Sequence, residues 1–121
     1  MLVNSCMTVF HKGYDAETRL ETWTRFNYGS KAKNTVWSHG GVGAKLNKGF
    51  SDANSIRIRI PYELNKNLDI NNFELEDMVV IDEVTTDITS QDDLKDYDVF
   101  KIISITDERN GNNQHIYIGA N

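Results

Sequence analysis

The strongest structural signal in this chain is DVFKIISITDERNGNNQHIYI, residues 98–118. Two runs rich in β-branched and aromatic residues flank a polar tip built around Asn110-Gly111, a dipeptide that tolerates positive φ. This pattern predicts a β-hairpin that closes the fold, and it places the chain in the β-rich class. The hairpin contains no chemical motif, so the function has to be sought in the rest of the chain.

Outside the hairpin, the clearest strand lies at residues 55–60, where Ile56, Ile58 and Ile60 alternate with Arg57 and Arg59. Strict alternation predicts a strand with its isoleucines on a buried face and its arginines on the other face. A proline follows at position 61. We therefore expect the strand to end there or to lie at an edge of the sheet.

Shorter runs predict further strands at residues 8–12, 22–28, 35–38 and 78–84, of which 22–28 has the mixed faces of an exposed or edge strand. Residues 15–19 predict a turn or a single helical turn. Residues 90–97 predict a short helix, with Ser90 at the N-cap and Asp93 at the third helical position. The expected fold is mainly β: a small β-barrel or sandwich of six to seven short strands, with one short helix and long loops.

A length of 121 residues suits one domain with a single modest core. We expect one β-rich domain over residues 1–121, with a flexible glycine-rich loop at about residues 39–54. No run approaches the roughly 18 apolar residues of a membrane span, and the first six residues do not have the pattern of a signal peptide. We therefore expect a protein made in the cytosol. Cys6 is the single cysteine, and we expect it to be a small apolar residue near the first strand.

The motifs of catalysis and cofactor binding are absent from the sequence. The glycine-rich segment lacks the Gly-Lys-Ser or Gly-Lys-Thr ending of a phosphate-binding loop. The three histidines, His11, His39 and His115, do not have the spacing of metal ligands. No nucleophile has a placed base and an orienting acid. We expect no enzymatic activity, no cofactor and no metal.

Charge is unevenly distributed along the chain. Residues 1–62 carry nine Lys or Arg against four Asp or Glu, a balance of +5, whereas residues 63–98 carry two against twelve, a balance of −10. If these halves occupy different sides of the domain, identical copies can dock head to tail and close into a ring. Folding that intermixes the charges is the alternative. The residues we expect at a subunit or partner interface are Lys45, Lys48, Arg57, Arg59, Asp92, Asp93 and Asp96.

The order of segments resembles a group of small structural proteins of tailed bacteriophages, the head-completion or head-tail connector subunits of phages and prophages of low-GC Gram-positive bacteria. The resemblance is carried by MTVFHK (7–12), YDAETRL (14–20), VW (36–37), IRIRIP (56–61), DMVV (77–80), DVFKI (98–102) and TDER (106–109), followed by His115. Such proteins commonly have a Gly-Asp pair before the strand at Met78, where this chain has Glu76-Asp77.

The resemblance implies a stopper-like subunit in the neck of the virion. Such a subunit forms a homo-oligomeric ring below the portal and adaptor proteins, closes the head and docks the tail. Packaged DNA would pass through the ring without sequence-specific binding, and acidic residues facing the channel would repel its backbone. Two alternatives remain: a tail-terminator or tail-completion ring protein, and an OB-like module that binds nucleic acid. No contact with a membrane is expected.

Overall fold

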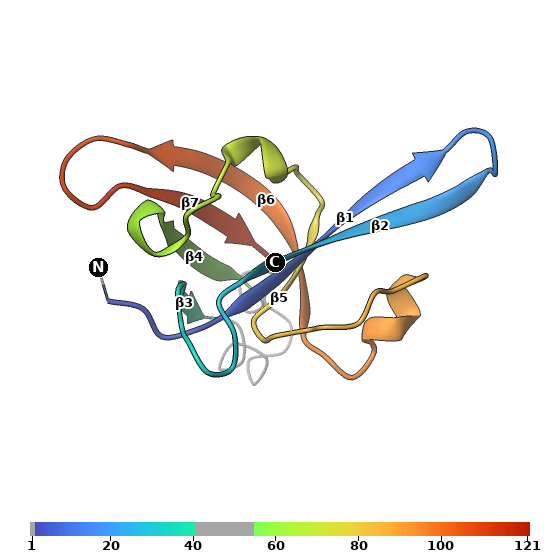
Figure 1. Ribbon diagram of the computed structural model, residues 1–121, viewed down its shortest axis with the longest axis horizontal. Helices are drawn as coiled ribbons and strands as arrows, with labels where there is room; N and C mark the ends of the chain where they lie inside the picture. The colour runs from blue at the N-terminus through green and yellow to red at the C-terminus, as the bar shows by residue number, and fades with distance from the viewer. Residues whose placement is uncertain (1, 41–54) are drawn as a thin grey trace.

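The computed structural model describes residues 2–40 and 55–121, which form one curved antiparallel sheet (Figure 1). The sheet order is β2-β1-β5-β6-β7-β4-β3. The strands are β1 (Met7–Asp15), β2 (Leu20–Tyr28), β3 (Trp37–Gly40), β4 (Ile56–Pro61), β5 (Met78–Val80), β6 (Val99–Glu108) and β7 (His115–Ala120). The predicted mainly β class is confirmed, and the described sheet has seven strands where six to seven were expected. No helix among the described residues is long and apolar enough to cross a membrane.

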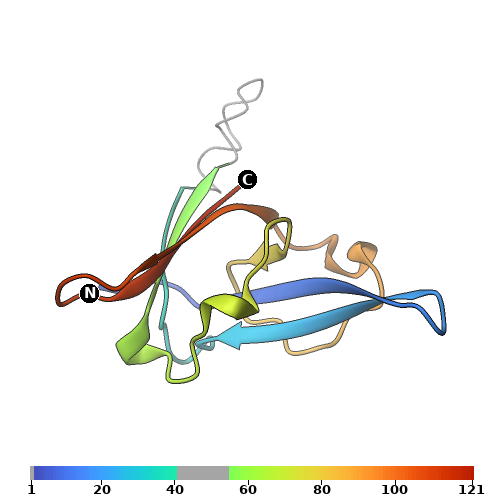
Figure 2. The same ribbon diagram turned by 90° about the horizontal axis from the view of Figure 1, so that it is seen from above.

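The sheet curls so that β4 and β7 face β1 and β2 across a main core (Figure 2). It does not close into a continuous barrel. A single bridge joins the segment before β1 to the segment before β3, with Ser5 N donating to Val36 O at 2.9 Å and Val36 N donating to Ser5 O at 3.0 Å. Cys6, beside this bridge, is buried as expected. The fold is therefore an open, strongly curved sheet with a sandwich-like interior.

The predicted C-terminal hairpin is present as β6 and β7, paired from Ile102 and Ala120 to Glu108 and His115. Its loop contains Gly111 at φ +86°, the left-handed conformation that glycine adopts without strain. A bulge lies between Ile102 and Ser104 and leaves the Ile103 side chain 55% exposed. The sequence signal at the turn therefore located both strands correctly.

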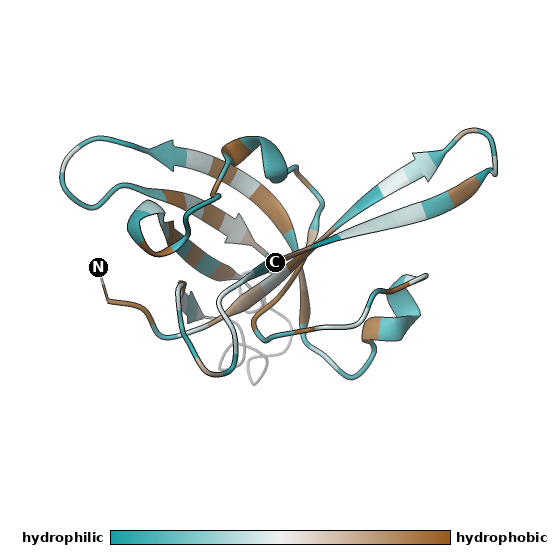
Figure 3. Cartoon of the chain, in the orientation of Figure 1, coloured by the Kyte–Doolittle hydropathy of each residue, from teal (hydrophilic) through white to brown (hydrophobic). Residues whose placement is uncertain are grey.

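The alternation at residues 55–60 is confirmed in β4. Ile56, Ile58 and Ile60 are at most 2% exposed and belong to the main core, while Arg57 points to solvent. β4 ends at Pro61, as predicted. It is not an edge strand, because it pairs with β3 on one side and with β7 on the other. In Figure 3 the hydrophobic positions alternate with hydrophilic ones along β4 and β7.

The strand predicted over residues 78–84 is only three residues long. β5 ends at Val80 because a buried side chain captures the backbone that follows: the Thr8 hydroxyl donates to Asp82 O at 2.8 Å and accepts from Val84 N at 3.0 Å. From there residues 81–98, the acidic strap, cross the outer face of β1 and β5. A second core forms under the acidic strap from Phe10, Met78, Val80, Val84, Ile88 and Leu94.

The helix predicted over residues 90–97 is shorter than expected. It is a 3-10 turn, η5 (Gln91–Leu94), one of three among the described residues beside η3 (Tyr62–Leu64) and η4 (Ile70–Asn72). The expected cap is present, because the Asp93 carboxylate accepts from Thr89 N at 2.9 Å and from Ser90 N at 3.3 Å. The chain then continues to β6, which begins at Val99.

The hairpin of β1 and β2 is longer than predicted and projects from the body as an arm (Figures 1 and 2). The predicted turn at residues 15–19 is confirmed, with Arg19 N donating to Asp15 O at 2.8 Å and Arg19 in the left-handed region at φ +58°. β2 is an edge strand, as its mixed faces predicted.

The turn before β5 contains a second residue in the left-handed region. Glu76 has φ +73°, at the position where the resemblance implies glycine. Its backbone N–H donates to Ile102 O at 2.8 Å, and Ile102 N donates to Asp77 O at 2.9 Å. These bonds to β6 hold Glu76 in a conformation that costs roughly 1–2 kcal/mol for a residue with a Cβ.

Candidate interaction faces

A row of large side chains crosses the outer face of β3, β4 and β7. The register places Trp37 opposite Arg59, and Arg59 opposite Tyr117. A second row places His39 opposite Arg57. We call Trp37, His39, Arg57, Arg59, His115 and Tyr117 the basic-aromatic face. Its members share one side of the sheet because the alternate residues of β4 and β7 are the buried isoleucines.

Arg59 is stacked between two aromatic rings in this face. Its guanidinium carbon lies 4.4 Å from the Trp37 ring centroid and 5.2 Å from the Tyr117 ring centroid. The Trp37 and His39 rings stack in turn at 5.9 Å and 12°. Within residues 2–40 and 55–121, neither Arg59 nor Arg57 forms an ion pair with a carboxylate. The face therefore presents cations that are positioned but not neutralised by a described residue, in a setting rich in the residue types of interaction hot spots.

One end of the basic-aromatic face is hollowed into a groove. Its lining, which we call the end groove, consists of Leu2, Trp37, Arg59, Glu108, Asn113, His115 and Tyr117. The His115 ring is fixed by a 2.8 Å hydrogen bond between its Nδ1 and Asn113 O. The lining of the groove thus includes the rings of Trp37 and Tyr117, the guanidinium of Arg59 and the carboxylate of Glu108.

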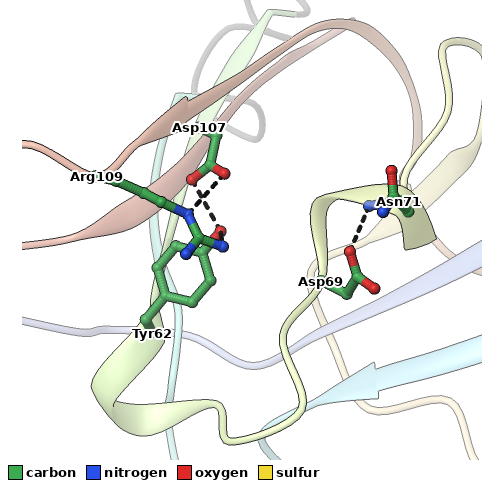
Figure 4. A network of polar contacts seen from close by, with 5 residues as sticks. All are labelled: Tyr62, Asp69, Asn71, Asp107 and Arg109. Atoms are coloured by element: carbon green, nitrogen blue, oxygen red, sulfur yellow. Dashed lines mark hydrogen bonds and ion pairs between the residues drawn. The ribbon is translucent and has the colours of Figure 1, made fainter.

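Three side chains, Tyr62, Asp107 and Arg109, form a polar clamp that fixes the β6–β7 hairpin beside the end groove (Figure 4). Tyr62 donates from its hydroxyl to Asp107 Oδ1 at 2.8 Å, while Arg109 donates from Nε to Asp107 Oδ2 at 2.9 Å and from Nη2 to the Tyr62 hydroxyl at 3.0 Å. Desolvation raises the pKa of the Asp107 carboxyl, but these hydrogen bonds and the Arg109 charge outweigh it, so the pKa is lowered. In the same view the Asp69 carboxylate accepts from Asn71 N and caps η4.

The acidic strap has the opposite charge. It contains seven Asp or Glu and one Lys, a balance of −6. Asp92 and Asp96 are exposed. Asp93 is also exposed but is committed to the cap of η5, and its pKa is lowered because Thr89 N and Ser90 N donate to its carboxylate. Asp87 contacts Arg25 of β2, with Arg25 Nη1 and Asp87 Oδ1 3.2 Å apart.

The two charged regions lie apart over much of their length and approach each other near the two ends of the acidic strap, where Asp82 and Asp96 line one pocket with Ser38 of β3. Along the long axis, η5 of the acidic strap lies on the same side as the β1–β2 arm, whereas β3, β4 and the β6–β7 loop lie toward the other end (Figures 1 and 2). The charge segregation seen along the sequence is therefore preserved only in part, because Arg25 of the basic half pairs with Asp87 of the acidic strap. The basic-aromatic face and η5 of the acidic strap are the parts that lie apart.

The structure places Arg57 and Arg59 on one face of the sheet and Asp92, Asp93 and Asp96 on the acidic strap. Lys45 and Lys48, with residues 41–54 of the expected glycine-rich loop, lie outside the described residues. Sequence reasoning missed Trp37 and Tyr117 as neighbours of Arg59. The alternation of Tyr117 with Ile116 and Ile118 was enough to predict that its side chain points outward. Its neighbours could not be predicted, because they depend on the order of strands in the sheet.

A further polar pair lies at the base of the arm. His11 Nδ1 is 2.8 Å from Asp77 Oδ1, and the other oxygen of this buried carboxylate accepts from Glu74 N at 2.9 Å. The pair therefore anchors the turn before β5 to β1. Among the described residues, no group of three or more His, Cys, Asp or Glu side chains is arranged to hold a metal ion.

Comparison with known proteins places the chain in a family without assigning it an activity. Residues 2–121 match a family described as a family of unknown function (DUF6751). The chain belongs to this family. No curated protein and no solved structure matches the chain.

Proposed function

We propose that this member of the family is a structural subunit of a tailed-phage head-tail connector. It forms a ring in the neck of the virion, below the portal and adaptor proteins, where it closes the head and docks the tail. It is made in the cytoplasm of the bacterial host and has no catalytic role. The resemblance of the sequence motifs suggests this function, and the opposite charges of the basic-aromatic face and the acidic strap are the observation that carries it.

Opposite charge on two regions of one subunit favours head-to-tail association. The basic-aromatic face of one copy can meet the acidic strap of the next, and such heterologous contacts close into a ring when the rotation between copies permits it. Exposed charges steer the encounter and set its orientation. Trp, Tyr and Arg, the residue types of the basic-aromatic face, are those that most often dominate interface energies.

The net charge of −5 suits a channel subunit. Acidic walls repel DNA phosphates, so packaged DNA passes through the ring without sequence-specific binding. A tail-terminator ring has the same requirements for closure. A subunit in the neck and a subunit at the end of the tail differ only in the partner that they bind. The portal-adaptor complex and the tail tube are therefore tested separately.

The experiment is mass photometry on the purified chain, first alone, then with the portal-adaptor complex, then with tail tubes. A defined ring on the portal-adaptor complex is expected. A ring on the tail tube alone would move the protein to the tail terminus, and a monomer in all three mixtures would overturn the proposal. Binding to a single-stranded oligonucleotide that weakens steeply with salt would favour the OB-like alternative.

Charge reversal tests whether the two regions meet. Arg57→Glu with Arg59→Glu is expected to reduce the fraction of chain in rings at least tenfold and to leave the fold intact. Lys33→Glu with Lys66→Glu makes the same change in net charge at exposed positions outside both regions and is expected to leave the rings unchanged. Adding Asp92→Lys and Asp96→Lys to the first variant restores opposite charges and should recover ring formation.

A further inference from the structure

The tip of the β1–β2 arm exposes apolar side chains that nothing in the described chain covers. Tyr14 is 66% exposed and Leu20 is 64% exposed, on either side of the turn at residues 15–19. A two-stranded ribbon is at best marginally stable in water, because it cannot bury a face of its own. The register pairs Tyr14 with Glu21 and Asp15 with Leu20, so Tyr14 and Leu20 extend from opposite faces of the ribbon and give its tip an exposed apolar side chain on each face. This tip is therefore the part of the arm most in need of a contact.

The two strands of the arm are joined along their length, and the base of the arm packs against the body. Lys12 forms an ion pair with Glu21 at 3.0 Å and lies 5.9 Å from the centroid of the Trp23 ring. Trp23 packs against the second core. The register of β1 and β2 continues without a break to Asp15 and Leu20. The tip is thus carried outward on an ordered support rather than on a loose loop.

The end groove lies at the other end of the long axis from this tip. Both views place the β6–β7 loop, which contributes Asn113 to the groove, at one end and the β1–β2 turn at the other (Figures 1 and 2). A projection at one end and a hollow at the opposite end of the same chain is the arrangement required for heterologous association.

The chemistry of the tip complements that of the groove. Tyr14 and Leu20 provide apolar surface for the rings of Trp37 and Tyr117. At the turn, Glu17 provides an exposed carboxylate that, among the described residues, has no ion-pair partner, and the groove contains the guanidinium of Arg59. The acidic strap exposes a single large hydrophobic side chain in the described residues, Tyr97 at 37%. In a contact between two copies, the acidic strap thus contributes charge, and the tip of the arm contributes apolar surface that becomes buried.

We infer that the tip of the β1–β2 arm of one copy inserts into the end groove of the next copy. This inference rests on the proposed function, since it identifies the contact that closes the ring. Charge complementarity between the acidic strap and the basic-aromatic face orients the two copies, and burial of Tyr14 and Leu20 against Trp37 and Tyr117 holds them together.

The first test removes the apolar tip. Tyr14→Ser with Leu20→Ser is expected to reduce ring formation on the portal-adaptor complex at least tenfold, measured by mass photometry, with an unchanged melting temperature of the free chain. Leu75→Ser is the matched control, because Leu75 is 62% exposed and belongs to neither the tip nor the groove. Rings of normal yield from the tip variant would overturn the inference.

The second test locates the contact by disulfide crosslinking. A chain with Leu20→Cys and Asn113→Cys is assembled, oxidised and run on a denaturing gel, beside each single variant. Cys6 is buried and is present in all of them. The double variant is expected to give a ladder of covalent multimers, and each single variant to give none. Rings without the ladder would refute the arm contact and leave the proposed function standing, whereas failure of the unmodified chain to form rings would refute both.

Discussion

The basic-aromatic face and the acidic strap carry opposite charge, and they are built in different ways. The basic-aromatic face arises from strand register: once β4 lies between β3 and β7, Trp37, Arg59 and Tyr117 are neighbours. Among the described residues, the acidic strap forms no ladder of backbone bonds with the sheet. It is held by apolar side chains inserted beneath it and by the hydroxyl of Thr8.

This difference predicts different responses to mutation. The basic-aromatic face shares its strands with the main core, so it persists as long as the sheet does. The acidic strap depends on a small second core and on a few polar anchors, so it can detach while the sheet remains folded. Four predictions test this contrast, from the largest expected effect to the smallest.

Leu94→Ala should have the largest effect. Leu94 is 1% exposed in the second core, and truncation of a buried leucine costs about 2–5 kcal/mol. Hydrogen exchange measured by mass spectrometry should increase across residues 81–98, while β4 and β7 keep their protection. Leu75→Ala, at an exposed position, is the control. An equal increase in exchange across all strands would mean that the acidic strap and the sheet unfold as one unit.

Thr8→Val removes the hydroxyl that anchors the start of the acidic strap and keeps the shape of the side chain. Asp82 O, Val84 N and Asn27 Nδ2 each lose a partner, and an unsatisfied buried polar group costs about 1–3 kcal/mol. Urea unfolding monitored by circular dichroism should report a loss in this range. Thr8→Ser keeps the hydroxyl and should lose less. Equal losses in the two variants would attribute the effect to packing.

Arg59→Gln should destabilise the chain by about 1 kcal/mol, because it removes the cation from between the Trp37 and Tyr117 rings. Arg57→Gln is the matched control: Arg57 is exposed on the same strand and contacts no aromatic ring in the part of the chain that the structure describes, so its loss should change the free energy of unfolding by less than about 0.5 kcal/mol. Urea unfolding of both variants measures the difference. Identical values would show that the stacking of Arg59 contributes nothing to the fold.

Acidification should release the cap of η5. The pKa of Asp93 is lowered in the folded chain because Thr89 N and Ser90 N donate to its carboxylate. Its stabilising contribution is therefore present above the ordinary Asp pKa of about 4 and is lost as the pH falls through the lowered, folded-state value. Exchange at residues 89–94, measured across this range and corrected for intrinsic rates, should increase at low pH. The non-titrating variant Asp93→Asn should show no such step.

Local patterns in the sequence predicted the parts of the fold that local chemistry determines. Asn110-Gly111 located the C-terminal hairpin, and the isoleucines of residues 56–60 identified a buried strand face. The predicted end of the strand at residue 84 was wrong. β5 ends at Val80 because of Thr8, whose hydroxyl donates to a carbonyl 74 residues away in the chain. Pro61 was compatible with two predictions for the strand at residues 55–60, an edge position or an end at the proline. Only the order of strands in the sheet decides between them.

The candidate site was predictable only in part. Arg57 and Arg59 were expected at an interface from charge alone, and they lie on one face. The stacking of Arg59 between Trp37 and Tyr117 was not predictable, because it requires β4 to lie next to β7, whose residues are more than 50 positions away along the chain. Contacts across a sheet depend on topology, which a single sequence constrains weakly.

The two tryptophans of the chain are divided between the two regions compared above. Trp37 lies in the basic-aromatic face, and Trp23 packs against the second core beneath the acidic strap. The molecule therefore contains its own pair of optical labels. When tryptophan is excited selectively, at a wavelength that the five tyrosines do not absorb, a chain with Trp23→Phe reports on the region where a neighbouring copy is proposed to bind. Under the same excitation, a chain with Trp37→Phe reports on the region where the acidic strap is held. Fluorescence can thus follow assembly and local opening separately, without an attached dye.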